Sequence, residues 1–320
     1  MIAEEALKKV GGLMKKTEKL DILTEGIGAN EEVAVWKPGN LNAETPALVA
    51  LHGNWATWQR NKNYGWFFAE RGFLVIAPTL RHHKSGNESS RELGKTSVLD
   101  YASDVLYLLK ILREGKLVSG FRPARPPVLM GHSMGGLVAQ VVAARTNLSG
   151  LILLCSAPSA GIGLHTDKDY AKRIARVAWR IFSGKPYLPD RESLYLYVYN
   201  GMPENEHPTL YERAVHESGR SSREILAGSG TGIAKTIAGL LSRSITVDES
   251  HVLCPILIIG CENDRIVPPN VARDMYYKYQ LAQKGAEIEI LEGFAHWPQY
   301  EPGWEESARF ILEWLKKTVL

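Results

Sequence analysis

The feature that most restricts the fold is a series of short, mainly apolar runs, each of which stops at glycine, proline or a polar residue. Their length is that of a β-strand, and the near absence of polar residues indicates strands buried on both faces. Such strands are typical of a mostly parallel sheet covered by helices on both sides. The runs predict strands at Ala47–Leu51, Phe73–Ala77 (stopped by Pro78), Pro127–Met130, Leu151–Cys155, Pro255–Gly260 and Glu287–Leu291.

Two earlier strands and a set of helices complete this pattern. Lys19–Thr24 and Glu32–Lys37 are joined by a Gly-Ile-Gly turn, so we expect an antiparallel hairpin at one edge of the sheet. Apolar residues at near-helical spacing also predict a short amphipathic helix within residues 2–16. The same spacing predicts helices between or after the strands at Tyr64–Arg71, Ser97–Glu114, Met134–Arg145, Pro269–Lys284 and Trp304–Leu315.

One long segment interrupts the alternation of strands and helices. Residues 159–248 contain no convincing buried strand, and a loop of that length is rare in a compact domain. We therefore predict an inserted helical cap at 159–248, within a catalytic domain formed by residues 1–158 and 249–320. Its helical patterns lie at Tyr170–Phe182, Leu210–Glu217, Arg223–Ala227 and Ala234–Leu241.

Composition excludes several classes of protein. The 38 basic and 35 acidic residues give a net charge of +3, which gives little reason to expect a nucleic-acid partner. The three cysteines lie in or beside apolar runs, and no signal peptide is recognised. Both features favour a reduced, cytoplasmic compartment. No apolar stretch approaches the ~18 residues that span a bilayer. Without CxxC or HExxH, no protein-built metal site is predicted.

The strongest chemical signal is Gly131-His132-Ser133-Met134-Gly135, which joins a predicted strand to a predicted helix. This pattern is the nucleophile elbow, in which glycine on either side lets neighbouring backbones pass closely while the serine hydroxyl is lifted clear of the sheet. Because the helix directs its positive end at the same place, the Met134 N–H can donate to a developing oxyanion. Ser133 is thus the predicted nucleophile.

A serine needs a base and an acid to act at ordinary pH. Among nine histidines, His296 alone follows the last predicted strand, in a loop that the sheet should bring over Ser133. Asp264 follows the strand Pro255–Gly260, so the chain order is nucleophile, acid, base, as this arrangement requires. Glu262 is the nearest alternative acid. The second oxyanion donor is predicted to be the Asn54 N–H after Leu51-His52-Gly53, with Trp55 as the alternative and His52 as a brace.

Together these segments resemble the α/β-hydrolase-fold enzymes of the esterase, lipase and acyltransferase type. The matching pieces are L-H-G-N-W, A-P-T-L-R-H-H-K-S-G, G-H-S-M-G-G, C-E-N-D-R-I-V-P-P and G-F-A-H-W-P, in that order from Leu51 to Pro298. The G-H-S-M-G-G and E-N-D-R-I-V-P pieces are similar to those of the monoglyceride-lipase-like branch. The resemblance implies an eight-stranded sheet and a helical cap after the sixth strand.

Two positions depart from the pattern of that family. Relatives usually carry glycine three residues before the acid, where this chain has Cys261, which affects the turn that presents Asp264. Thr79 stands where an acidic residue is usual, and His82-His83-Lys84 replaces a glycine-rich stretch, which affects the loop near the pocket. Neither departure touches the predicted triad.

These features predict a cofactor-independent serine hydrolase of short or medium acyl esters or monoacylglycerols, acting through an acyl-enzyme. Thioester, lactone or C–C hydrolysis, acyl transfer and cofactor-free haloperoxidation remain alternatives on the same triad, as does a non-catalytic ligand receptor. The segment His165–Lys185 carries six basic and two acidic residues. It either packs on the core or makes weak contact with a membrane or lipid surface. Tyr187, Tyr195, Tyr197 and Tyr199 either line a pocket or pack; substrate-binding residues and oligomeric state are not predicted.

Overall fold

The computed structural model describes residues 19–23, 29–30, 32–83, 90–164, 168–230, 232–283 and 285–320 of the chain. The helix predicted within residues 2–16 and the Gly-Ile-Gly turn lie outside this part. No helix that the structure describes is both long enough and apolar enough to cross a bilayer.

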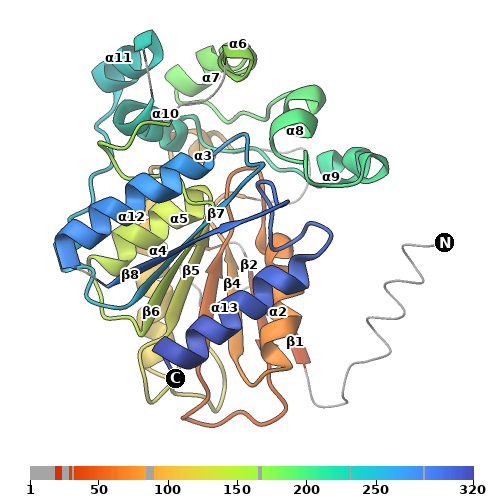
Figure 1. The fold of residues 1–320 in the computed structure, drawn as a ribbon, viewed down its shortest axis with the longest axis vertical. Coiled ribbons are helices and arrows are strands. Elements are labelled where there is room, and N and C mark those ends of the chain that lie inside the picture. Colours follow the sequence, from red (N-terminus) through yellow and green to blue (C-terminus); the bar gives the residue numbers. More distant parts are fainter. Residues whose placement is uncertain are drawn as a thin grey trace.

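An eight-stranded sheet forms the centre of the molecule (Figure 1), as the apolar runs predict. Its order is β1-β2-β4-β3-β5-β6-β7-β8. The hairpin β1–β2 is antiparallel and pairs antiparallel with β4, while all other neighbours are parallel. The strands are β1 (Lys19–Leu23), β2 (Glu32–Lys37), β3 (Ala47–Leu51), β4 (Leu74–Thr79), β5 (Val128–His132), β6 (Gly150–Leu154), β7 (Ile256–Cys261) and β8 (Ala286–Leu291).

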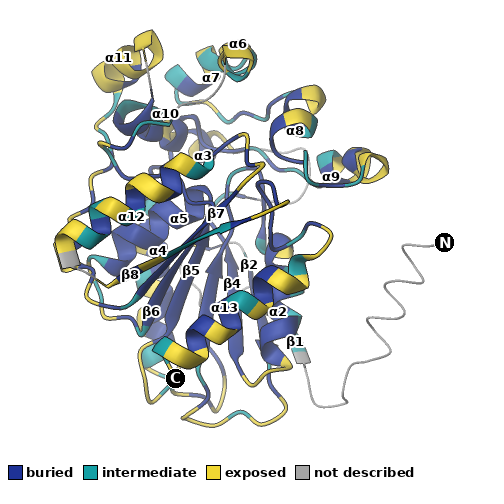
Figure 2. Ribbon diagram, viewed as in Figure 1, coloured by how far each residue is buried: buried dark blue, intermediate teal, exposed yellow. Residues whose placement is uncertain are grey.

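Helices cover both faces of this sheet, and side chains that alternate along each strand feed two separate cores. In β6, for example, Leu151 and Leu153 belong to one apolar cluster, and Ile152 and Leu154 belong to the other. This two-sided burial (Figure 2) explains why the inner strands β3, β4, β5, β6 and β7 are apolar at nearly every position. The first core is covered by α4 (Val98–Arg113), α5 (Met134–Ala143) and α12 (Pro269–Gln283), and the second by α2 (Lys62–Ala69) and α13 (Trp304–Thr318).

One predicted strand end is wrong. Pro78 does not stop its strand, because β4 continues through Pro78 to Thr79. On one side, β4 pairs with β3 only over Leu74–Ile76, whereas β2 pairs with it as far as Thr79. A proline here therefore disturbs only one neighbouring strand.

Helices occupy most of the segment between β6 and β7, and they gather beyond one end of the sheet (top of Figure 1). They are α6 (Lys168–Ala175), α7 (Ala178–Phe182), α8 (Arg191–Tyr197), α9 (His207–Glu212), α10 (Gly219–Ser229) and α11 (Gly232–Leu241), with short 3-10 turns at Glu204–Glu206 and Glu249–His251. Two further short elements precede β5, namely the 3-10 turn Trp58–Asn61 and α3 (Arg91–Lys95).

The inserted helices differ in detail from the predicted ones. The helix expected over Tyr170–Phe182 is two helices, because Val177 leaves the helical conformation. The helix expected over Leu210–Glu217 begins and ends earlier, and Glu217 instead forms an antiparallel bridge with Tyr187. The α8 helix, which Asp190 caps, was not predicted at all.

Glu217 fastens the inserted segment to the rest of the fold. Its buried carboxylate accepts hydrogen bonds from His83 Nε2 (2.9 Å), the Tyr101 hydroxyl (3.0 Å) and the Ser218 N–H (2.6 Å). Nearby, the Val215 N–H donates to the Trp55 carbonyl at 3.1 Å. Because these contacts join the segment to the loops after β3 and β4, its base is fixed to the sheet.

The His83–Glu217 pair is a buried ion pair. Burial by itself lowers the pKa of His83, but the charge and hydrogen bond of Glu217 and the carbonyls of Arg81 and Leu80 raise it by more. The net pKa of His83 is therefore raised above its ordinary value. A raised histidine pKa means that the protonated form is favoured in the folded state.

We expect Glu217→Gln to reduce the free energy of unfolding by about 3 kcal/mol, because His83 loses its counter-charge in a buried place. The loss should be fully present below about pH 6.5, the histidine pKa of the unfolded chain, and should shrink as pH rises through the raised pKa of folded His83. Urea unfolding from pH 5.5 to 8.5 measures this, with the exposed Glu212→Gln as control. A difference that does not change with pH would contradict the ion pair.

Candidate active site

Ser133 lies at the sharp turn from β5 into α5 and has φ 53° and ψ −124°, outside the region that non-glycine residues prefer. Close packing enforces this strain. A Cβ atom at Gly131 would overlap the backbone of Gly135, and one at Gly135 would overlap the carbonyl oxygen of His52. Three backbones thus meet around Ser133, as the nucleophile-elbow pattern predicts.

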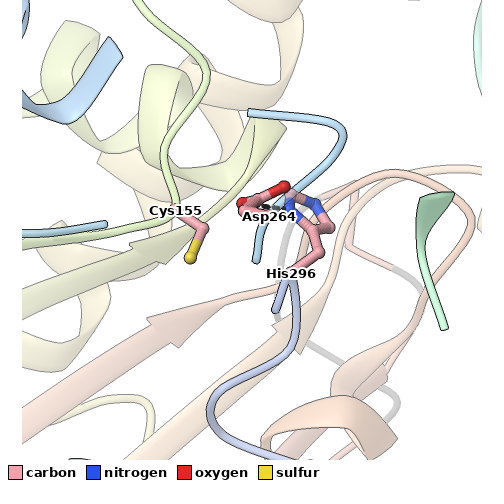
Figure 3. Close-up of side chains that lie close together, drawn as sticks. All are labelled: Cys155, Asp264 and His296. Carbon is pink, nitrogen blue, oxygen red and sulfur yellow. Dashed lines mark hydrogen bonds and ion pairs between the residues drawn. The ribbon is translucent and has the colours of Figure 1, made fainter. Parts of the chain in front are cut away.

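The structure brings Ser133, His296 and Asp264 together. The Ser133 hydroxyl donates to His296 Nε2 at 3.1 Å, and His296 Nδ1 donates to Asp264 Oδ2 at 2.8 Å. All three side chains are buried. Figure 3 shows the dashed contact between Asp264 and His296. These contacts fit an imidazole that carries its proton on Nδ1 and leaves Nε2 free to take the serine proton.

Asp264 is itself held in place by the turn after β7. Its Oδ1 accepts the backbone N–H groups of Ile266 at 2.9 Å and Val267 at 2.8 Å, which leaves Oδ2 for His296. Glu262, the alternative acid, is exposed and accepts the Gly293 N–H at 3.0 Å. Of the two carboxylates, the structure therefore places only Asp264 against His296.

Cys155 also lies in this region (Figure 3). Its Sγ is within 4.8 Å of a carboxylate oxygen of Asp264 and of a ring nitrogen of His296. Both Asp264 oxygens are already engaged, and Cys155 Sγ lies 3.3 Å from Cys261 Sγ. Burial raises the pKa of the Cys155 thiol well above its ordinary value, so the sulfur stays protonated. These contacts fit a hydrogen-bonded triad and not a metal-ligand set.

The two predicted oxyanion donors both border Ser133. Met134 begins α5, so its N–H has no partner within the helix. The loop after β3 presses on the serine, since a Cβ atom at Gly53 would lie 2.7 Å from Ser133 Cβ. Asn54 follows directly, and its N–H makes no hydrogen bond within the described chain. Trp55, the alternative, has φ 58° and lines the same pocket.

Two buried histidines support this arrangement without facing the substrate side. His52 Nδ1 donates to the Gly53 carbonyl at 2.8 Å, and His52 Nε2 accepts the Leu80 N–H at 3.0 Å. Burial and neighbouring His83 lower the pKa of His52 to about 3, so it braces the loop as a neutral ring. His132 Nε2 donates to the His296 carbonyl at 2.7 Å, and burial likewise lowers its pKa.

Glu301 is a positioning residue that the sequence analysis missed. Its buried carboxylate accepts the N–H groups of Ala295 and Trp297, each at 2.7 Å, and so clamps the backbone on both sides of His296. Burial raises its pKa, although both N–H bonds oppose that shift. A Cβ atom at Gly201 would overlap this carboxylate, so the inserted segment seals it from water. In the sequence, the only indication of this role is that Glu301 lies five residues after His296.

An apolar pocket of about 340 Å³ opens at Ser133. The inserted helices supply most of its wall, including Tyr170, Ile174 and Ile225. Of the four tyrosines that were candidates for a pocket, only Tyr187 lines it. The other three pack against neighbouring rings: Tyr195 on His207, Tyr197 on Tyr170 and Tyr199 on Trp297.

Comparison with known proteins shows the family to which this chain belongs. The sequence model of the alpha/beta hydrolase family matches residues 48–308, so the chain belongs to that family. It is 22% identical over 284 residues to the monoacylglycerol lipase of Mycolicibacterium smegmatis (strain ATCC 700084 / mc(2)155), covering 88% of this chain and 91% of the lipase.

Two solved structures share the fold. One is a thermophilic esterase of Thermogutta terrifontis (TM-score 0.58, 22% identity). The match covers 94% of this chain and 100% of the esterase chain. The other is the 2-hydroxy-6-oxo-6-phenylhexa-2,4-dienoate hydrolase of Rhodococcus sp. strain RHA1 (TM-score 0.62, 18% identity), with the same two coverages.

Weakening the contacts of Glu301 with the His296 loop should slow catalysis. In Glu301→Gln one oxygen becomes an amide nitrogen, so the N–H of Ala295 or Trp297 loses its acceptor, which costs about 1–3 kcal/mol. The loop would then hold His296 less accurately against Ser133, so kcat should fall about 5- to 100-fold with little change in KM.

Two measurements separate positioning from folding. The rate at which a fluorophosphonate labels Ser133 should fall by the same factor as kcat, while circular dichroism stays unchanged. Glu262→Gln is the matched control, since that exposed glutamate holds the other end of the same loop through Gly293. Equal losses in both variants would argue against a specific clamp.

Proposed function

We propose that this member of the alpha/beta hydrolase family cleaves carboxylic esters by nucleophilic catalysis at Ser133. The observation that carries the proposal is the unbroken chain of contacts from Asp264 through His296 to Ser133, at the mouth of an apolar pocket. A serine activated in this way attacks a carbonyl carbon that is held beside it.

In the proposed reaction, Ser133 Oγ bonds to the ester carbonyl carbon while its proton passes to His296 Nε2. The N–H groups of Asn54 and Met134 stabilise the negative charge on the carbonyl oxygen. The bond to the alcohol oxygen then breaks, and His296 returns the proton to the leaving alcohol. Water, deprotonated by His296, then attacks the acyl carbon. The bond from that carbon to Ser133 Oγ breaks, His296 gives the proton back to Ser133 Oγ, and the carboxylic acid leaves. Asp264 orients His296 and stabilises its imidazolium form.

The pocket favours acyl groups of short or medium length, including those of monoacylglycerols. Its volume of about 340 Å³ is at the lower end of the ~300–1,000 Å³ typical of small-molecule sites. Its lining is mainly aliphatic and includes Ile174, Ile225 and Ile237. Such a wall accepts an acyl chain through burial of apolar surface.

One observation favours a second candidate function, hydrolysis at a lipid surface. Ile233 and Leu240 of α11 are 79% and 81% exposed, and Ile233 also lines the pocket. Figure 2 shows most of α11 exposed at the outer end of the inserted helices. An exposed apolar helix next to the pocket would suit substrates that are presented by a lipid aggregate.

A fluorophosphonate serine probe tests the nucleophile. We expect labelling of the wild type, none of Ser133→Ala, and a loss of about 10⁴-fold or more in kcat for His296→Ala. Ser222→Ala is the matched control, because its hydroxyl lines the same pocket and bonds to Tyr187.

The outcomes separate the candidates. Labelling that persists in Ser133→Ala contradicts the proposed nucleophile. A wild type that binds esters without labelling or turnover would instead be a ligand receptor. Turnover of thioesters, lactones or a carbon–carbon substrate far above that of nitrophenyl esters would replace the ester class while keeping the triad.

A chain-length series tests the pocket. Ala178→Leu adds bulk to its wall, so the preferred acyl chain of nitrophenyl esters should shorten by about two carbons while hydrolysis of the acetyl ester changes less than about twofold. The ratio of kcat/KM between octanoyl and acetyl esters measures the shift. An unchanged ratio would mean that the acyl chain lies elsewhere.

A further inference from the structure

A second cleft, of about 780 Å³, lies on the other side of α10 from the apolar pocket. Arg220, Arg223 and Glu224 of α10 face this cleft, whereas Ser222 and Ile225 face the pocket. The cleft is closed by the end of α3, the start of α4, the turn after α7 and the segment after α11. The proposed ester hydrolysis makes no use of it.

The cleft carries an excess of positive charge. Lys95, Arg145, Arg220, Arg223 and Arg243 line it, against one carboxylate, Glu224. That carboxylate is already engaged, since Oε1 accepts from Arg220 and Oε2 accepts from the Ser97 hydroxyl and the Val98 N–H. Within the described chain, the other four cations have no carboxylate at ion-pair distance. Cations gathered without counter-ions attract an anion.

Arg223 is the best oriented of these cations. It is half-buried, its Nε donates to the Ser242 hydroxyl at 2.6 Å, and its guanidinium also donates to the Phe182 carbonyl. Burial lowers its pKa, which means that the site would be more stable with an anion beside it. A guanidinium fixed in this way offers its remaining N–H groups as a planar fork, which matches phosphate oxygens.

The rim of the cleft is apolar. Leu99 and Leu241 both line it and are 41% and 51% exposed, and the buried Ile245 lies in its wall. A lone inorganic anion would leave these leucines in water. A ligand that joins an anionic group to an apolar part would cover them.

From these contacts we propose that the cleft is a binding site for an organic phosphate, with the phosphate at Arg223 and its neighbouring cations and the apolar part against Leu99 and Leu241. The ligand is either a soluble phosphate monoester or the headgroup region of a phospholipid, which share this chemistry. Because Arg223 holds Phe182, which lines the apolar pocket, the ligand would contact the wall that the two cavities share.

Calorimetric titration with hexyl phosphate, hexanol and inorganic phosphate tests the soluble source. Co-sedimentation with phosphatidylglycerol and phosphatidylcholine vesicles tests the lipid source. The main variant is Lys95→Gln with Arg243→Gln, because both side chains are exposed and make no hydrogen bond within the described chain. Its control is Arg122→Gln with Arg309→Gln, which removes the same charge from exposed places outside the cleft.

We expect hexyl phosphate, or phosphatidylglycerol vesicles, to bind the wild type, the control and Ser133→Ala alike. The main variant should bind at least tenfold more weakly, and Arg223→Gln should show the same loss. Loss on hexyl phosphate identifies a soluble ligand, and loss on phosphatidylglycerol alone identifies a lipid. No binding of either, binding of hexanol equal to that of hexyl phosphate, or equal losses in main variant and control would overturn the proposal.

Discussion

The close approach of three backbones around Ser133 is the constraint on which the rest of the site depends. Gly131, Gly135 and Gly53 lie where a side chain would collide with the turn, with the loop after β3 or with the serine itself. This crowding keeps Ser133 in a strained conformation, and Asn54 and Met134, the proposed oxyanion donors, line the same pocket as the serine. A single steric arrangement thus presents the Ser133 hydroxyl to the pocket and places the proposed oxyanion donors beside it.

Around this turn, buried polar contacts of three kinds do the positioning. Asp264 takes two backbone N–H groups before it meets His296, and Glu301 clamps the loop that carries His296. Neutral His52 fixes the loop after β3. Each contact satisfies a buried polar group that would otherwise cost free energy, so stability and geometry are maintained by the same hydrogen bonds.

Much of this arrangement could be predicted from sequence because its signals are local. Strands buried on both faces leave apolar runs, and the elbow requires glycine at fixed offsets from Ser133. The order of the strands then places Asp264 and His296 at one end of a parallel sheet. The prediction was wrong at Pro78, where a proline lies inside β4 because one side of the strand no longer has to pair with β3.

The rest depended on contacts between distant parts of the chain. In the sequence, nothing distinguishes Glu301 and Glu217 from other charged residues. Their roles arise from hydrogen-bond donors that the fold brings around each carboxylate. The start of α8 is an exception, because its signal is local: the Asp190 side chain caps the helix by accepting the Ser193 N–H. The wall of the pocket also depends on contacts between distant segments, and of the four candidate tyrosines only Tyr187 lines it.

The inserted segment is secured unevenly, and this has a consequence for how such a chain diversifies. Its base is fixed by Glu217 and Val215, whereas α6 has no buried residue and α11 has only Ala238. Substitutions in these two outer helices reshape the pocket while removing little buried surface, so they cost little stability. Selection for a new substrate can therefore act on α6 and α11 without disturbing Ser133, and mutational libraries confined to them should retain a high fraction of folded variants.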